Sequence, residues 1–257
     1  MTDPEVRPFR WQDSHRLIPS RYSESGTVLS TIAENPKEVE DLVLLDGATN
    51  DRVQSEERGS IGISTFELLY AIPNAHVVNA AYAHPNESGS RFNDNTRGAW
   101  YAADRQKASI AEVVYHKARR LGEIVVPDAP DQRPQRDLTM YDDWLADFQA
   151  DFHVLDPPED FHKFLQPEPV PQCYAASQAL ARHLLDQGSN GIIYPSVRYE
   201  GSECLVCFRP ALVYNPHRSE RLEITLTANK TGYDNRVRQV RFGPTRPRRA
   251  VRRAGVQ

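Results

Sequence analysis

The sequence predicts an α+β fold in a single domain, with short strands and helices mixed. Three observations support this: helices with a clear apolar face, short apolar runs typical of buried strands, and no regular strand–helix–strand alternation. No glycine-rich phosphate loop of either familiar spacing is present, which argues against a doubly wound nucleotide-binding fold. The 257 residues are enough to bury one sizeable core.

The first elements along the chain are one predicted helix and one predicted strand. NPKEVEDLVLLDG at 35–47 carries helix signals, since Asn35 can cap it, Pro36 suits its first turn and Gly47 ends it. HVVNAAYAH at 76–84 alternates loosely between apolar and polar residues and is predicted to be a strand. A polar loop follows, and AWYAA then has the pattern of a short buried strand.

The clearest helix is RQKASIAEVVYHKARRL at 105–121, with Asp104 placed to cap it. Its apolar face comprises Ile110, Ala111, Val114, Ala118 and Leu121. Glu112 falls on the rim of that face, where a carboxylate can point into a groove. It can equally be a solvated glutamate paired with His116 or Arg119.

The second half of the chain is predicted to contain two more helices and two more strands. The first helix is DDWLADFQADF, and a proline-rich irregular stretch follows it at 157–171. YAASQALARHLLDQG is a helix that Gly188 ends, and GIIYP and CLVCFRP are apolar strands joined by a polar turn.

The charge is unevenly distributed, although the net charge is only −4. Residues 236–257 hold eight arginines and no acidic residue, so this end carries +8 and the remainder −12. A basic end can contact nucleic acid or an acidic partner. Its Gly, Pro and Arg content is more typical of a flexible, solvated tail, and we do not expect direct nucleic-acid binding.

No targeting or metal signal is evident. The sequence has no apolar run long enough for a transmembrane helix and no signal-peptide core, so we expect a cytoplasmic protein. Cys204 and Cys207 form a CxxC inside a strand-like run, with no second pair and no histidine cluster nearby. We therefore expect buried thiols, Cys173 included, and no metal site.

Single polar residues at the ends of elements do not by themselves reveal a site. Arg91 on its own is most simply a solvated loop arginine, Tyr101 a core residue and Ser196 a turn residue. The periodicity of the sequence does not show whether these residues have such structural roles or belong to a binding or catalytic site.

Two stretches, GSRFNDNTRGAWYAADRQKASIAEVVYH and YAASQALARHLLDQGSNGIIYPSVRYEGSECLVCFRP, resemble in this order the motifs of the RES domain family. That family is named for a shared arginine, glutamate and serine. The resemblance places these three, an accompanying tyrosine and a second arginine at Arg91, Glu112, Ser196, Tyr101 and Arg16.

The resemblance also suggests a domain layout. It runs over residues 14–230, with 1–13 as an N-terminal leader and 22–75 as an inserted or extended part. Ser90 stands where the family usually has a second glycine, and Phe92 where it usually has tryptophan. Both substitutions keep the local character of a small residue beside an aromatic one.

The family is similar to ADP-ribosyltransferases in fold and includes toxins that degrade NAD, which implies an NAD⁺-cleaving toxin enzyme here. NAD would be the substrate, and no prosthetic group is implied. The implied catalytic residues are Glu112, Arg91, Tyr101 and Ser196. The residues implied to bind the dinucleotide are Arg16, Arg91, Phe92, Asn93, Tyr101, Ser177 and Ser196.

Several alternatives stay open at this stage. The acceptor of the ribosyl group could be water, phosphate or a protein side chain, and the last would make the chain an ADP-ribosyltransferase. A different class of function is also open: the chain could be a non-catalytic module that binds nucleic acid or a partner through the arginine tail. The resemblance implies a helix-turn-helix (Xre-type) antitoxin as partner, and it leaves a homo-oligomer open.

Overall fold

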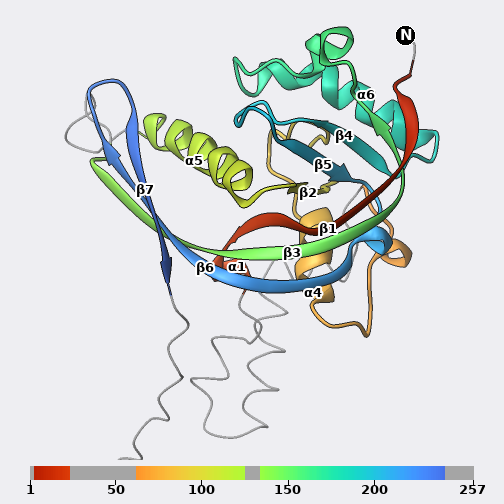
Figure 1. Cartoon of the computed structure of the whole chain (residues 1–257), viewed down its shortest axis with the longest axis horizontal. Helices are drawn as coiled ribbons and strands as arrows, with labels where there is room; N and C mark the ends of the chain where they lie inside the picture. Colours follow the sequence, from red (N-terminus) through yellow and green to blue (C-terminus); the bar gives the residue numbers. More distant parts are fainter. Residues whose placement is uncertain (1–2, 24–61, 125–133, 241–257) are drawn as a thin grey trace, which may run out of the picture.

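Seven strands form one sheet, in the order β1-β2-β5-β4-β3-β6-β7, with an additional pairing of β1 to β3 (Figure 1). The computed structural model describes residues 3–23, 62–124 and 134–240. The strands are β1 Glu5–Pro19, β2 Trp100–Ala103, β3 Arg136–Val154, β4 Gly191–Pro195, β5 Glu203–Cys207, β6 Tyr214–Ala228 and β7 Tyr233–Val240. The predicted α+β class is confirmed, while the likeness to ADP-ribosyltransferases stays a prediction.

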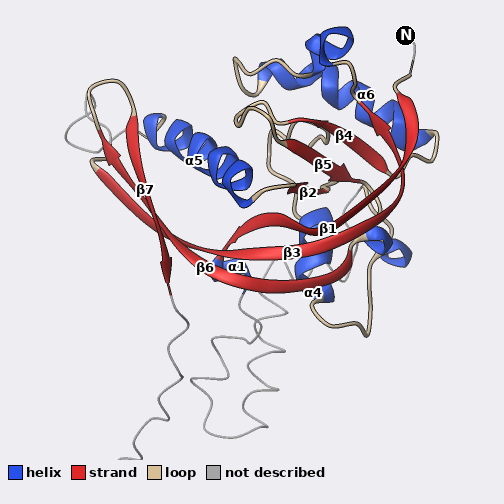
Figure 2. Cartoon of the chain, in the orientation of Figure 1, coloured by secondary structure: helices blue, strands red, loops and turns tan. Residues whose placement is uncertain are grey.

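The helices lie on both sides of these strands (Figure 2). The α-helices are α1 Ser20–Ser23, α4 Ala75–Ala83, α5 Gln106–Gly122 and α6 Ala175–Asp186. The 3₁₀ turns are η2 Thr65–Glu67, η3 Pro158–Phe164, η4 Gln172–Tyr174 and η5 Pro210–Leu212. The predictions of helices at 105–121 and 174–188, and of strands at AWYAA, GIIYP and CLVCFRP, are confirmed.

Five of the strands close into a ring. β1 pairs antiparallel with β3 over most of its length, and its His15 also pairs with Ala103 of β2. β2 continues to β5 and β4, and β4 returns to the end of β3 through Ile192, parallel to His153. β6 and β7 extend from the other edge of β3.

Three apolar clusters fill the spaces between these layers. The first lies between β1–β3 and β2–β5–β4, with α4 against it, and contains Trp100 and Phe148. The second lies between α6 and the opposite face of β2–β5–β4 and contains Phe92 and Tyr194. The third, around Ile224, lies under α5. Because successive residues of a strand face opposite sides, Trp100 and Tyr101 of β2 belong to different clusters.

Residues 142–152 belong to β3, so the helix predicted there was wrong. Trp144, Ala146, Phe148 and Phe152 are separated by even numbers of residues, and all four are buried in the first cluster. Apolar residues at every second position are the pattern of a strand with one buried face.

Helix α4, Ala75–Ala83, covers nearly all of the strand predicted at 76–84, so that prediction was also wrong. Val78 and Tyr82, one helical turn apart, are both fully buried. Asn79 accepts a hydrogen bond from the Leu69 amide and donates one to the Leu69 carbonyl, each at 2.9 Å. A buried asparagine bonded in this way joins α4 to the chain before it.

Asp104 does not cap α5, contrary to the sequence prediction. Arg105 holds the N-cap position and makes no side-chain capping bond. The Asp104 carboxylate instead accepts hydrogen bonds from the Ser202 hydroxyl and, at 3.2 Å, from the Glu203 amide. It therefore ties the start of α5 to β5.

The predicted N-terminal leader is part of the sheet. Residues 5–13 lie within β1, which pairs with β3 from Glu5↔Val154 to Trp11↔Phe148. The partner strand, β3, lies far away in the sequence. No local pattern reveals such a partner.

The predicted basic tail begins as paired strand. Residues 236–240 belong to β7 and pair with β6, for example Arg236 with Thr225. Residues 241–257, and the helix predicted at 35–47, lie outside the described residues.

Asp142 is a completely buried carboxylate at the centre of β3. Arg221 donates to both of its oxygens, at 2.6 and 3.0 Å, and Ser23 donates a third hydrogen bond. Removing the carboxylate would leave the Arg221 charge without its partner in the interior. We expect Asp142→Ala to lower the free energy of unfolding by about 3–5 kcal/mol. Chemical denaturation measures this, with Asp151→Ala, at an exposed position of the same strand, as the near-neutral control.

The same pair predicts a pH dependence of stability. Burial raises the pKa of Asp142, but the hydrogen bonds from Arg221 and Ser23 outweigh it, so the pKa lies below its ordinary value. The stabilisation is therefore complete above about pH 4, which is the pKa of an aspartate in the unfolded chain. It is lost as the pH falls through the lower pKa that Asp142 has in the folded protein. Denaturation between pH 7 and pH 2 should show a shallower acid decline for Asp142→Asn. An unchanged decline would contradict the prediction.

Candidate active site

Arg91 lies in the loop between α4 and β2, and only 7% of it is exposed. Its Nη1 donates to the carbonyls of Phe164, at 3.3 Å, and Gln166, at 2.8 Å, and its guanidinium lies 5.0 Å from the Tyr174 ring centre. The tight turn before it requires Gly89, whose φ is +66° and whose missing Cβ would lie 2.2 Å from the Asn93 carbonyl.

Tyr101 and Asn93 lock this loop onto β2. The Tyr101 hydroxyl donates to Asn93 Oδ1 at 2.8 Å and accepts from the Phe92 amide at 2.9 Å. The Asn93 amide group donates to the Asp94 and Arg97 carbonyls. Burial raises the pKa of Tyr101 far above its ordinary value, so its hydroxyl stays protonated at neutral pH.

Glu112 lies on α5 with 31% of its side chain exposed. Its Oε2 is 3.6 Å from Nε2 of His116, the local pairing that the sequence left open. Burial raises the pKa values of Tyr174, Tyr194 and Cys204, and the negative charge of Glu112 adds to each shift.

Ser196 lies directly after β4, in the turn towards β5. Its Oγ accepts hydrogen bonds from the amides of Tyr199, at 3.1 Å, and Arg198, at 3.4 Å.

Arg91, Glu112 and Ser196, the three residues of the family resemblance, all influence the pKa of the Cys204 thiol. Burial first, and the charge of Glu112 second, raise the pKa of this thiol to about 12, while Ser196 and Arg91 oppose the shift. Contacts with the segment 165–171 bring the three elements together: Arg91 donates to the Gln166 carbonyl, and Arg198, two positions after Ser196, donates to the Pro167 carbonyl. The Arg198 guanidinium also lies over Tyr115 of α5, the helix that carries Glu112. The structure thus brings together residues that are up to 105 positions apart in the sequence.

Phe92 and Ser177 are more enclosed than the sequence analysis expected. The Phe92 ring is 1% exposed and packs edge-on against Tyr194, with ring centres 4.8 Å apart. Ser177 is fully buried, and its hydroxyl donates to the Tyr174 carbonyl. Both side chains support the residues around the site and present no free surface to a ligand.

Arg16 lies on the other side of β2. Its guanidinium is 4.8 Å from the Trp100 ring centre, and its Nη1 donates to the Tyr101 carbonyl at 3.2 Å. Burial lowers the pKa of Arg16 to about 10. It therefore reaches the site only through the backbone of β2, apart from the cluster around Cys204.

Three aromatic residues and one arginine of the site were missed from the sequence: Tyr115, Tyr174, Tyr194 and Arg198. The Arg198 guanidinium lies 3.4 Å from the Tyr115 ring centre, and Arg198 follows Ser196 by two positions. Tyr174 directly precedes α6, and Tyr194 is the next-to-last residue of β4. Their only sequence signal was their place inside the two resembling stretches.

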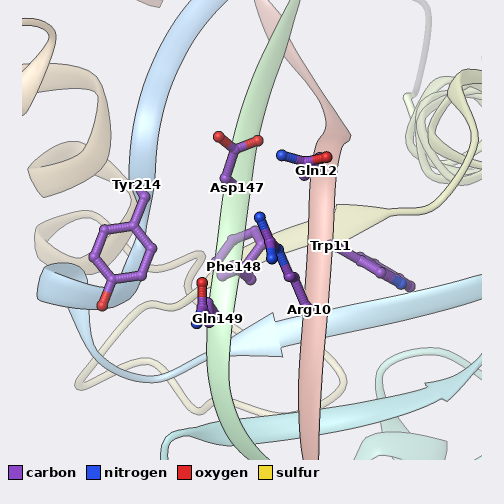
Figure 3. A pocket seen from close by; sticks show the side chains of 7 residues that line it. All are labelled: Arg10, Trp11, Gln12, Asp147, Phe148, Gln149 and Tyr214. Atoms are coloured by element: carbon purple, nitrogen blue, oxygen red, sulfur yellow. The ribbon is translucent and has the colours of Figure 1, made fainter.

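A separate groove lies over β1, β3 and β6 (Figure 3). It is lined by Arg10, Trp11, Gln12, Asp147, Phe148, Gln149 and Tyr214. The Asp147 carboxylate there already accepts from the Asp13 amide and the Asn215 side chain. None of the predicted site residues borders this groove, so it is not the candidate site.

The described residues hold no group of three or more His, Cys, Asp or Glu side chains that could bind a metal ion. Their three cysteines are free thiols. None of the described helices is long and apolar enough to cross a bilayer.

The Tyr101 hydroxyl is expected to hold the Arg91 loop in place. Tyr101→Phe leaves the Phe92 amide and Asn93 Oδ1 without their hydrogen-bond partner. We therefore expect the free energy of unfolding to fall by about 1–3 kcal/mol. The Phe92 amide should also exchange its hydrogen faster. Hydrogen exchange measures this, with Tyr214→Phe, on an exposed tyrosine, as the control. Unaltered exchange at Phe92 would show that the hydroxyl does not hold the loop.

Comparison with known families gives one match. The model of the RES domain matches residues 68–227, a segment that contains Arg91, Tyr101, Glu112 and Ser196 but not Arg16. No curated protein matches the chain.

Proposed function

The chain belongs to the RES domain family, and on this premise we propose that it cleaves the nicotinamide–ribose bond of NAD⁺ as the toxin of a toxin–antitoxin pair. The observation that carries the proposal is that the Arg91 loop, the turn that begins at Ser196 and helix α5, which carries Glu112, all contact the segment 165–171. A carboxylate, a guanidinium and a hydroxyl beside buried aromatic rings have the chemistry that an anionic, ring-bearing substrate requires.

Glu112 has the central role in the proposed reaction. Nicotinamide leaves with the electron pair of the C–N bond and becomes neutral, so no strong general acid is needed. The ribose carbon is left with positive character, as in glycoside cleavage. A fixed carboxylate in a partly buried site stabilises this developing charge. Water, with loss of a proton, or phosphate then bonds to the same carbon.

Arg91 is the proposed contact to the diphosphate of the substrate. Among the described residues, no carboxylate lies within ion-pair distance of it, and its Nη1 binds only backbone carbonyls. Phosphate oxygens are stronger partners for a guanidinium than carbonyls, because both groups are charged. A buried arginine held by carbonyls alone can therefore exchange them for an anionic ligand.

Ser196 and the aromatic residues would orient the nicotinamide end. Ser196 Oγ accepts two backbone hydrogen bonds and keeps one proton. That proton can be donated to the carboxamide or to a ribose oxygen. The ring of Tyr101, which is less enclosed than that of Phe92, would supply flat apolar surface.

The proposed activity implies a partner and a location. An enzyme that depletes NAD⁺ harms the cell that makes it, so we propose an antitoxin of the helix-turn-helix type that blocks it. We also place the protein in the cytoplasm, where its substrate is found.

Glu112→Gln tests the proposed role of the carboxylate. It removes the charge and keeps the shape, so nicotinamide release from NAD⁺ should fall by about 10²–10³-fold. Chromatography of the products measures this. The matched control is Glu123→Gln, a carboxylate at the end of the same helix that pairs with Arg119, and it should leave the rate unchanged.

The acceptor is identified in the same assay. Release that requires phosphate indicates phosphorolysis, and release without it indicates hydrolysis. Full activity of folded Glu112→Gln would remove the assignment of this residue. NAD⁺ binding without release would favour the alternative of a protein acceptor. No NAD⁺ binding at all would overturn the proposed function.

A further inference from the structure

The segment 165–171, between η3 and η4, binds two arginines of the site. Its Gln166 carbonyl accepts from Arg91 at 2.8 Å, and its Pro167 carbonyl accepts from Nη2 of Arg198 at 2.6 Å. This segment, which we call the strap, therefore holds both guanidiniums by backbone oxygens.

Arg198 is largely enclosed, and its one carboxylate neighbour in the described structure lies beyond hydrogen-bond distance. Its side chain is 11% exposed, its guanidinium lies over Tyr115, and its Nε is buried with no hydrogen-bond partner in the described structure. The Oε1 of Glu168 is 3.9 Å from Nη2, beyond hydrogen-bond distance. A buried guanidinium donor that lacks an acceptor calls for an explanation, and a missing anionic ligand is one.

Glu168 lies at the outer end of the same cluster. Its side chain is 54% exposed. One oxygen accepts the Tyr115 hydroxyl, and the other accepts the Val170 amide at 3.2 Å. The strap thus presents a carboxylate to Arg198 from the solvent side.

Arg91 and Arg198 donate to the carbonyls of two consecutive residues of the strap, Gln166 and Pro167. The two guanidiniums are therefore held at neighbouring positions. Their charges also oppose the burial that raises the pKa values of Cys173 and Tyr174, beside the strap in η4. Two cations held mainly by carbonyls match a ligand with two neighbouring negative charges.

We propose that Arg198 binds the diphosphate of the substrate together with Arg91, and that Glu168 occupies Arg198 until the diphosphate displaces it. The proposal deepens the proposed function and rests on it for the identity of the substrate. Binding exchanges two guanidinium–carbonyl contacts for guanidinium–phosphate contacts, so the strap moves away from both arginines.

Titration calorimetry with inorganic pyrophosphate tests this without any turnover. Arg198→Met should weaken binding about 10–100-fold, the effect of losing a charged hydrogen-bond partner. Glu168→Gln should tighten binding about two- to fivefold, because the competing charge is removed from an exposed position. The control is Arg7→Met, an arginine of β1 that pairs with Glu5 and Asp156, and it should match the unaltered protein.

The assay with substrates adds a second readout. Arg198→Met should raise the KM for NAD⁺ but leave cleavage of nicotinamide riboside, which has no phosphate, unchanged. Equal pyrophosphate binding by the Arg198→Met and unaltered proteins would overturn the inference. If Arg198→Met does not fold, failure of the exposed Glu168→Gln change to tighten binding overturns it as well.

The two proposals can fail separately. NAD⁺ cleavage that is insensitive to Arg198 and Glu168 would leave the proposed function in place and remove this inference. Pyrophosphate binding that depends on Arg198, without any nicotinamide release, would support the anion site and remove the proposed reaction.

Discussion

The long antiparallel pairing of β1 with β3 is the interaction on which the rest of the structure depends. β3 receives β6 along its other edge and β4 near its end, while β1 receives β2. Asp142 and Asp143 lie in the middle of β3, both fully buried. Asp142 binds α1 through Ser23, and Asp143 binds α5 through Gln106. The elements that carry the site are thus attached to this pair directly or through one neighbour.

The site forms where the outer face of the ring meets α5 and the strap. β2 and β4 present Tyr101 and Tyr194 to that face, and β5 presents Cys204. The hydrogen bonds of Asp104 to Ser202 and Glu203, at the start of β5, help to set where α5 begins, and so where Glu112 lies. Because each side chain comes from a different paired element, small movements of any one of them are resisted by the whole sheet.

The electrostatics of the site favour an anion. Arg91 and Arg198 are largely buried, and backbone carbonyls hold them in place of carboxylates at hydrogen-bond distance. Two other arginines of the described chain have carboxylate partners at hydrogen-bond distance, Arg97 in Glu67 and Arg221 in Asp142. Arg16, on the other side of β2, donates to a backbone carbonyl as Arg91 and Arg198 do. Within the described residues, the lack of a carboxylate at hydrogen-bond distance is therefore shared by these three arginines, of which Arg91 and Arg198 donate to the same segment, the strap.

The sequence by itself determined the α+β class, the two amphipathic helices α5 and α6, the short strands β2, β4 and β5, and the family. These depend on local periodicity and short motifs, which neighbouring residues encode. Only the tertiary structure decided that residues 5–13 and 142–152 are paired strands, that Phe92 is a core residue, and that Arg198 and Tyr174 join the site. Each of these depends on contacts between residues far apart in the chain, such as Trp11 with Phe148 or Arg91 with Gln166. A local pattern holds no record of which distant partner a residue meets, since that is set by how the whole sheet closes.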